Sequence, residues 1–267
     1  MNTIITAVLC VTCIGLVLSV ILCAASKLMA VKTDERAAEL EECLPGSNCG
    51  ACGYAGCAGY AKALLEAGAK TNLCTPGGAE TAERISELLG VEAEILAPKF
   101  AVVRCGGSER TLKMEYKGPL TCAAAKLLHG GEFACAFGCI GYGDCKSVCP
   151  FGAVCVDTKD NSPAKINAAR CTACGLCVTA CPNNLITLED CSEGGLKKST
   201  VLCSNIEKGA AARKKCQSAC IGCGKCVREC PSGALRLEDN LAVLDYEKCT
   251  SCSHCAEICV TGCIALL

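Results

Sequence analysis

The sequence has few of the side chains that normally build a protein core or a catalytic site. Tryptophan is absent, aromatic residues make up 3% of the 267 positions, and the two histidines are His129 and His254. No G-x-G-x-x-G motif opens a helix after a strand and no P-loop is present, so neither a nicotinamide site nor a phosphate-binding loop is indicated. Two histidines suggest no acid–base constellation. We therefore expect no substrate chemistry on this chain itself.

Cysteine, in contrast, accounts for 31 residues. A cysteine fraction above roughly 8–10% of a short chain usually indicates a secreted disulfide scaffold. The spacing argues otherwise, because repeated C-x2-C-x2-C-x3-C runs place thiols too close together for one-to-one pairing but suit several thiolates around one inorganic core. Thiolates around iron predict a reducing compartment. Since large apolar residues are scarce between the runs, we expect clusters to act as the cores and to couple metal binding to folding.

The formal net charge of −1 understates the acidity of the protein with its clusters. Four thiolates around an oxidised four-iron core carry a net charge of about −2. The complete protein is therefore anionic, and nothing in the sequence suggests nucleic-acid binding.

Residues 1–26 contain no charged side chain and are long enough to span a bilayer. A cleaved signal peptide would need a basic segment first, but the first lysine is Lys27, after the apolar run. Lys32 and Arg36 follow, so the positive-inside rule puts the rest of the chain in the cytoplasm. The sequence predicts a single-pass anchor in the cytoplasmic membrane over 1–26 and a membrane-proximal spacer over 27–42.

A first four-cysteine domain is predicted over 43–90, with helices at 58–68 and 80–90. Glycines crowd its first three cysteines, as a backbone that wraps closely around a cluster requires. A zinc site is the alternative, but zinc ribbons use paired C-x2-C knuckles. The spacing favours iron–sulfur and gives the ligand set Cys49, Cys52, Cys57 and Cys74. The connecting segment 91–134 contains a strand-like stretch and two cysteines without partners at ligand spacing, Cys105 and Cys122, for which a structural role is favoured.

The remainder of the chain is an internal repeat with a period near 80 residues. Residues 135–189 and 216–267 each contain two cysteine runs, and 190–215 connects them. In such runs three cysteines bind one four-iron cluster and the fourth, before proline, binds the neighbouring cluster. Three predicted sites follow: Cys149 with Cys171, Cys174 and Cys177; Cys259 with Cys220, Cys223 and Cys226; and Cys230 with Cys249, Cys252 and Cys255.

The first run of the repeat departs from this pattern, because Tyr142 stands where the matching run has Cys223. A tyrosinate is a hard ligand of high pKa and suits a soft thiolate site poorly. Cys135, one helical turn before Cys139, is the nearby spare thiol. We therefore predict a fifth site made of Cys135, Cys139, Cys145 and Cys181. No role is assigned to Cys10, Cys13, Cys23, Cys43, Cys105, Cys122, Cys155, Cys191, Cys203, Cys216 and Cys263.

The order of these parts resembles a known family. An apolar N-terminus, the motif LPGSNCGACGYAGC followed by CTPGG, and ferredoxin repeats together resemble the B subunits of Rnf complexes. The resemblance implies an α+β chain of small iron–sulfur domains: one transmembrane helix, a four-cysteine 4Fe-4S domain and two ferredoxin-like double-cluster modules. It also implies a membrane complex that moves electrons between reduced ferredoxin and NAD, coupled to Na⁺ or H⁺ translocation.

In that family the B subunit is expected to take electrons from soluble ferredoxin and to work with other membrane subunits. A membrane-tethered polyferredoxin that serves another oxidoreductase, such as a hydrogenase, would share every motif and stays open. The residues Arg213, Lys214 and Lys215, with Lys197 and Lys198 upstream, form a basic run beside Cys216. A solvated charge run is the simpler interpretation, but a basic patch next to a cluster would also steer an acidic ferredoxin toward it.

Overall fold

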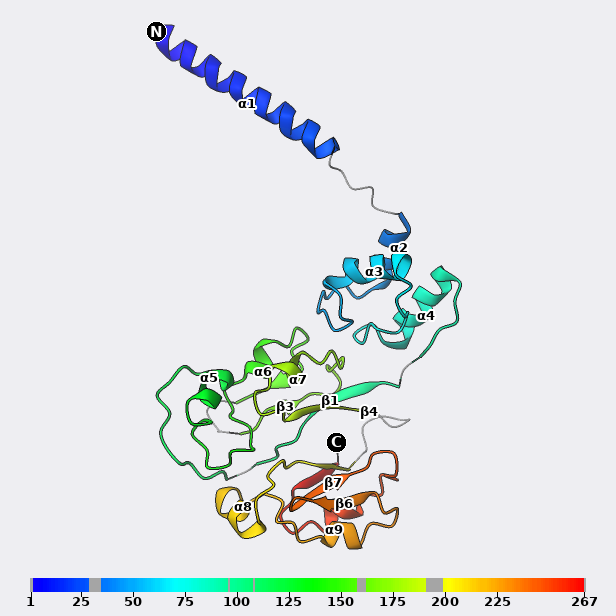
Figure 1. Ribbon diagram of the computed structural model, residues 1–267, viewed down its shortest axis with the longest axis vertical. Helices are drawn as coiled ribbons and strands as arrows, with labels where there is room; N and C mark the ends of the chain where they lie inside the picture. The colour runs from blue at the N-terminus through cyan, green and yellow to red at the C-terminus, as the bar shows by residue number, and fades with distance from the viewer. Residues whose placement is uncertain are drawn as a thin grey trace. The chain divides into compact units, whose positions relative to one another are not determined.

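The computed structural model describes residues 2–28, 35–95, 97–107, 109–157, 162–190 and 199–266. The chain divides into two compact units, Met1–Glu39 and Leu40–Leu267. The first unit contains the helix α1 (Asn2–Leu28), whose apolar side chains Leu16, Val20 and Leu22 are exposed (Figure 1). Over the described residues, no helix combines the length and the apolar character needed to cross a membrane. The anchor over 1–26 therefore stays a prediction, and residues 29–34 of the spacer lie outside the described residues.

The four-cysteine domain is built from α2 (Glu35–Cys43), α3 (Gly56–Glu66) and α4 (Gly78–Leu89). The helices predicted over 58–68 and 80–90 are thereby confirmed to within two residues. Tyr60 and Ile85 are fully buried between them, together with Leu40 and Leu64. α4 ends at Gly90, whose left-handed φ of 67° is the usual conformation of a glycine that terminates a helix.

The first ferredoxin-like half runs from β1 to β4. Its elements are β1 (Lys99–Val103), α5 (Cys122–Leu127), α6 (Asp144–Ser147), β2 (Val154–Cys155), β3 (Lys165–Ile166), α7 (Leu176–Ala180) and β4 (Ile186–Asp190). β1 pairs antiparallel with β4, with Val103 opposite Ile186, and β2 pairs antiparallel with β3. Two short hydrogen-bonded ladders thus frame the cysteine loops.

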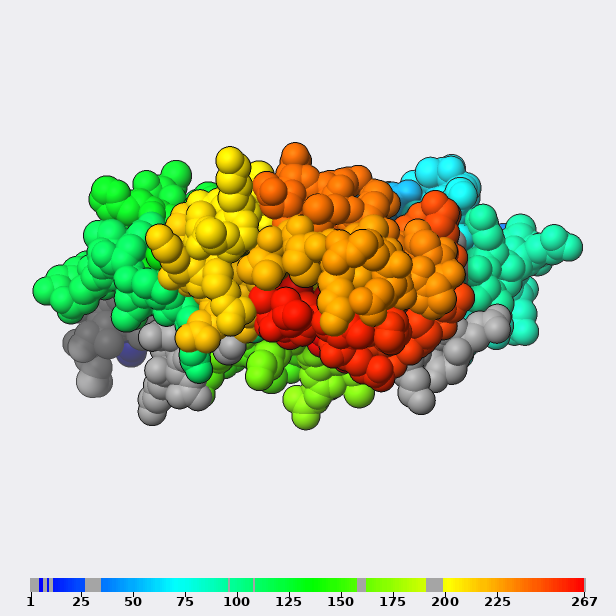
Figure 2. Space-filling model, turned by 90° about the horizontal axis from the view of Figure 1, so that it is seen from below, coloured from blue at the N-terminus to red at the C-terminus, as the bar shows by residue number. Residues whose placement is uncertain are grey.

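The second half repeats this plan. Its elements are β5 (Ser199–Val201), α8 (Gly209–Lys215), α9 (Lys225–Arg228), β6 (Leu235–Glu238), β7 (Leu241–Leu244), α10 (His254–Glu257) and β8 (Ile264–Leu266). β5 pairs antiparallel with β8, with Val201 opposite Ile264, and β6 pairs with β7. In Figure 2, α8 (yellow) lies on the surface beside the rest of this half (orange to red).

The first strand of each half lies outside the module boundaries that the cysteine pattern suggested. β1 belongs to the predicted connecting segment 91–134, and β5 to the predicted connector 190–215. Each strand pairs with the last strand of its own half, more than 60 residues further on. Strand pairing over that separation leaves no local spacing signal in the sequence, whereas cysteine runs do.

Cysteines make up much of each core. In the first half Cys145 and Cys177 are buried with Val103, Val154 and Ile186. In the second half the buried residues include Cys203, Cys216, Cys220, Cys226, Cys255 and Cys263. The mixed helices and strands agree with the expected α+β class.

Candidate cluster-binding sites

The four cysteines of the N-terminal domain face one another. Burial raises the pKa of the Cys74 thiol, and the charges of Cys57, Cys49 and Cys52 raise it further, so all four sulfurs lie within electrostatic range. The loop is held by Asn48, whose side-chain oxygen accepts a hydrogen bond from the backbone N–H of Cys57 at 2.7 Å. A Cβ atom on Gly56 would come within 2.6 Å of that oxygen, which explains the glycine at this turn.

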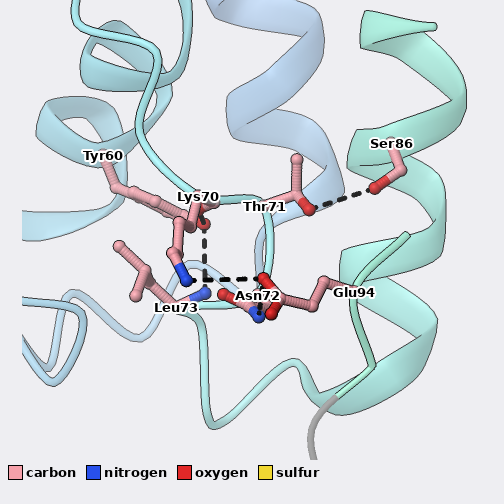
Figure 3. A network of polar contacts seen from close by, with 7 residues as sticks. All are labelled: Tyr60, Lys70, Thr71, Asn72, Leu73, Ser86 and Glu94. Atoms are coloured by element: carbon pink, nitrogen blue, oxygen red, sulfur yellow. Dashed lines mark hydrogen bonds and ion pairs between the residues drawn. The ribbon is translucent and has the colours of Figure 1, made fainter. Parts of the chain in front are cut away.

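A polar network fixes the segment just before Cys74 (Figure 3). The Tyr60 hydroxyl on α3 donates to the carbonyl of Lys70 at 2.5 Å and accepts from the N–H of Leu73 at 3.3 Å. The Ser86 hydroxyl on α4 donates to Thr71 at 3.1 Å. The segment 70–73 is thereby attached to both helices, and the thiol of Cys74 is presented to the other three.

In the first half, one predicted ligand set is brought together as a group. A cavity is lined by Cys149, Cys171, Cys174 and Cys177. Burial, together with the charges of the other three thiols, raises the pKa of Cys177 to about 11. Two backbone N–H groups point at these sulfurs, that of Ala101 at Cys171 and that of Ala153 at Cys149, each at 3.4 Å.

The cavity expected to contain Cys135 has a different fourth cysteine. Its sulfur-bearing residues are Cys122, Cys139, Cys145 and Cys181. Burial raises the pKa of Cys145 to about 12, with contributions from the charges of Cys139, Cys122 and Cys181. The structure thus groups Cys122 with this set and not Cys135, which lines another cavity.

Cys122 reaches this cavity because it is the first residue of α5. The carboxylate of Asp144, at the start of α6, accepts hydrogen bonds from the N–H groups of Cys122 and Ala123 at 2.8 and 2.9 Å. An acidic group satisfying the first N–H groups of a helix stabilises that end. Asp144 stands two residues after Tyr142, so the turn that lacks a thiol holds the helix that supplies one.

Tyr142 is directed away from a ligand role. Its hydroxyl donates to a carboxylate oxygen of Glu132 at 3.3 Å, and its ring lies 5.5 Å from that of Tyr116. Burial, with the neighbouring Glu132 carboxylate, raises the pKa of Tyr142 to about 12. A protonated phenol is no match for a soft iron–thiolate site.

Sequence reasoning missed Cys122 because it precedes Cys139 by 17 residues and belongs to no repeated spacing. The surplus of cysteines in 91–134, where two thiols stood without partners, was the only available signal.

The second half brings its two predicted sets together as well. One cavity is lined by Cys220, Cys223, Cys226 and Cys259, and also by Cys263, whose sulfur lies 3.7 Å from that of Cys259. In the other set, burial raises the pKa of Cys255. The charges of the remaining three thiols raise it further, and these are Cys249, Cys252 and Cys230.

A sixth group contains cysteines from both halves. One cavity is lined by Cys105, Cys135, Cys203 and Cys216. Cys203 and Cys216 are buried, and the other two are half-buried.

The donors in all six groups are sulfur alone. Among the described residues no group of three or more Cys, His, Asp or Glu side chains is close enough to hold a single metal ion. Where a cavity is found, the thiols instead stand around it, as thiolates that bind different irons of one cube do. Soft sulfur ligands and backbone N–H groups aimed at sulfur fit iron–sulfur clusters. Such sites transfer single electrons.

The basic run precedes Cys216 within α8. Lys215 forms an ion pair with Glu207 at 2.5 Å, and Arg213 donates to the carbonyl of Gln217 at 2.8 Å. Lys197 and Lys198 lie outside the described residues.

Family models recognise three parts of the chain. Residues 44–76 match a model for an Fe-S cluster, residues 164–187 a 4Fe-4S binding domain, and residues 219–263 a 4Fe-4S dicluster domain. None of these ranges includes Cys105, Cys122, Cys135, Cys203 or Cys216.

Curated relatives match nearly the whole chain. The B subunit of the Na(+)-translocating ferredoxin:NAD(+) oxidoreductase complex of Acetobacterium woodii is 39% identical over 94% of this chain and 74% of its own length. The proton-translocating counterpart of Clostridium ljungdahlii is 40% identical over 99% of this chain and 93% of its own. The B subunit of the ion-translocating oxidoreductase complex of Methanosarcina acetivorans is 39% identical over 95% and 94%.

Proposed function

Because the chain belongs to the family of B subunits of ion-translocating (Rnf) oxidoreductase complexes, we propose that it accepts electrons from reduced ferredoxin and relays them through 4Fe-4S clusters to other subunits of the complex. The relatives are named as ferredoxin:NAD(+) oxidoreductase subunits, and the chain has an electron-transfer role through its 4Fe-4S domains. The ferredoxin donor and the route are our proposal.

The observation that carries the proposal is that neighbouring cysteine groups lie side by side. The charge of Cys177 contributes to the raised pKa of Cys145, so two groups of the first half adjoin. In the second half the charge of Cys255 contributes in the same way to Cys226. Cys174 likewise lies within range of Cys49 of the N-terminal domain. Adjacent clusters are what an electron relay needs.

We propose the ligand sets accordingly. Bound clusters would supply one-electron carriers, and the residues hold them through deprotonated thiols. Four sets are those expected from the runs, and in the fifth Cys122 takes the place of Cys135. They are Cys49, Cys52, Cys57 and Cys74; Cys122, Cys139, Cys145 and Cys181; Cys149, Cys171, Cys174 and Cys177; Cys220, Cys223, Cys226 and Cys259; and Cys230, Cys249, Cys252 and Cys255.

We further propose that residues 1–26 attach the chain to the cytoplasmic membrane, with the cluster domains on the cytoplasmic side. The exposed apolar side chains of α1 support this, since Leu16, Val20 and Leu22 are 65%, 65% and 69% exposed. Fractionation of cells that produce the chain with and without residues 1–26 tests it. Recovery of both forms in the soluble fraction would contradict the attachment.

Rapid mixing under strict anaerobiosis tests the relay. The purified chain with its clusters is mixed with chemically reduced ferredoxin, and the visible absorbance of its clusters is followed. We expect bleaching in proportion to the electrons supplied, with equal oxidation of the ferredoxin. Clusters that dithionite reduces but reduced ferredoxin does not would refute the proposal.

A further inference from the structure

Four cysteines that the ferredoxin runs do not use line one cavity. Cys105 and Cys135 come from the first half, and Cys203 and Cys216 from the second. The cavity encloses about 350 Å³ of space free of protein atoms. The three cavities lined by ferredoxin-run cysteines enclose about 330, 370 and 400 Å³. By size and by donors, this cavity is of the same kind.

The sulfurs of this group lie close to one another. Burial raises the pKa of the Cys216 thiol, and the charges of Cys105 and Cys135 raise it further. Burial also raises the pKa of Cys203, to which the charge of Cys105 contributes. Each member is therefore within electrostatic range of another, and Cys105 is within range of all three.

The internal repeat explains how the group arises. Cys105 follows the end of β1 by two residues, and Cys203 follows the end of β5 by two. The backbone N–H of Cys139 points at the sulfur of Cys105, and that of Cys220 at the sulfur of Cys203, both at 3.4 Å. Each half contributes an equivalent thiol at the same place.

The second pair obeys the same relation, because Cys135 and Cys216 each stand four residues before the first cysteine of the following run. Each half thus supplies two thiols, which is too few for a four-iron cluster, and the two halves together supply four.

Backbone contacts bring the halves together at this cavity. The N–H of Gly106 donates to the carbonyl of Leu202 at 2.8 Å, and the hydroxyl of Ser204 donates to the carbonyl of Arg104 at 3.0 Å. Arg110 forms an antiparallel bridge with Cys216. The site therefore depends on docking of the halves and not on either alone.

The group also lies between the two double-cluster modules. Cys105 adjoins Cys139 of the first module, and Cys203 adjoins Cys220 of the second, through the hydrogen bonds just described. The amide of Asn205 donates to the sulfur of Cys135 at 3.5 Å, and a hydrogen bond to sulfur is one of the means by which a protein tunes a cluster.

We propose that Cys105, Cys135, Cys203 and Cys216 bind a further 4Fe-4S cluster that connects the two modules. This inference rests on the proposed relay and extends it. One electron enters from a reduced cluster of one module, which is thereby oxidised, and one electron leaves to the oxidised cluster of the other. No bond is formed or broken. Without this site the relay would have to cross from Cys139 to Cys220 with no carrier between the modules.

Native mass spectrometry of the reconstituted chain counts clusters directly. We expect about 24 irons per chain, where the ferredoxin runs and the N-terminal domain alone would account for about 20. A mass corresponding to the lower number, with or without one zinc ion, would overturn the inference.

The double variant Cys135→Ala, Cys216→Ala assigns the additional cluster. We expect it to lose about four irons. The control Cys155→Ala, at an exposed position on β2 that lines no described cavity, should keep the full number. Full iron in the double variant would overturn the inference. If the double variant does not fold, the count on the unaltered chain still decides.

Reduction kinetics test the connecting role. Bleaching by ferredoxin should become biphasic in the double variant, because one module then fills slowly, and should stay monophasic in the control. Monophasic bleaching in both would overturn the role of a connection. The iron counts do not depend on ferredoxin, so a complete set of clusters that ferredoxin cannot reduce would refute only the proposed function.

Discussion

Cys122 and Tyr142 together decide whether the cavity of the first half has a fourth thiol from its own side of the fold. Tyr142 directs its hydroxyl to Glu132, and Cys122 enters the cavity from the first turn of α5. The variant Cys122→Ala should therefore lose one cluster or convert it to a three-iron form, since no other sulfur lines that cavity. Iron analysis and low-temperature EPR measure this.

The reciprocal change provides the control. Tyr142→Cys restores the ferredoxin spacing and should return the lost iron to Cys122→Ala. Full cluster content in Cys122→Ala without the second change would show that the thiol of Cys122 is no ligand.

Tyr60 holds the segment before Cys74 through two hydrogen bonds, to Lys70 and from Leu73. Removing the hydroxyl in Tyr60→Phe leaves a buried carbonyl and a buried N–H short of a partner, at a cost of about 1–2 kcal/mol in the free energy of unfolding. Urea unfolding of the cluster-containing chain, followed by its visible absorbance, measures the loss.

Tyr54→Phe is the matched control. Its ring stacks on Tyr60 at 5.5 Å, and the described residues contain no hydrogen bond from its hydroxyl. We expect a change within about 0.5 kcal/mol. Equal losses in the two variants would show that the ring, and not the hydroxyl of Tyr60, is what matters.

At the scale of elements, α8 places three basic side chains next to Cys216. Lys215 is engaged with Glu207, so Arg213 and Lys214 are the better positions to alter. If an acidic ferredoxin approaches here, Arg213→Glu with Lys214→Glu should slow electron entry at low ionic strength and have little effect at high ionic strength, where charges are screened. Rapid mixing over a salt series measures both.

A reversal of equal charge on the N-terminal domain serves as the control. Lys62→Glu with Arg84→Glu, on α3 and α4, changes the net charge by the same amount far from α8 in the sequence. An identical slowing in both pairs would indicate an effect of total charge and would contradict docking at α8.

The pairing of β1 with β4 and of β5 with β8 makes each ferredoxin-like half depend on its clusters as well. Buried cysteines stand in the cores where other proteins have large apolar side chains. Removal of iron by a chelator should leave those thiols around empty space and expose the strands, because metal binding supplies the free energy of folding. Hydrogen exchange should then show loss of protection in β1, β4, β5 and β8.

The N-terminal domain offers an internal comparison within the whole molecule. Tyr60 and Ile85 are fully buried there, so α3 and α4 should retain more protection than the strands after iron is removed. Unchanged protection throughout the chain without iron would show that the clusters do not stabilise the fold.

The sequence by itself determined whatever depends on local spacing. The loops of three cysteines, the helices α3 and α4 and the repeat of the two halves follow from residues near one another, and the structure groups Cys149 with Cys171, Cys174 and Cys177 as the runs indicated. A ligand loop must wrap one cluster, so its spacing is written in the chain.

Tertiary structure alone decided which distant residues meet. Cys122 enters the cavity of Cys139 because α5 is capped by Asp144, and Cys135 leaves it for the cavity shared with Cys105 and the second half. These contacts join residues 17 to 111 positions apart in the sequence, with no repeated interval between them. Strand pairing and the docking of two equivalent halves bring them together, and neither is expressed in local spacing.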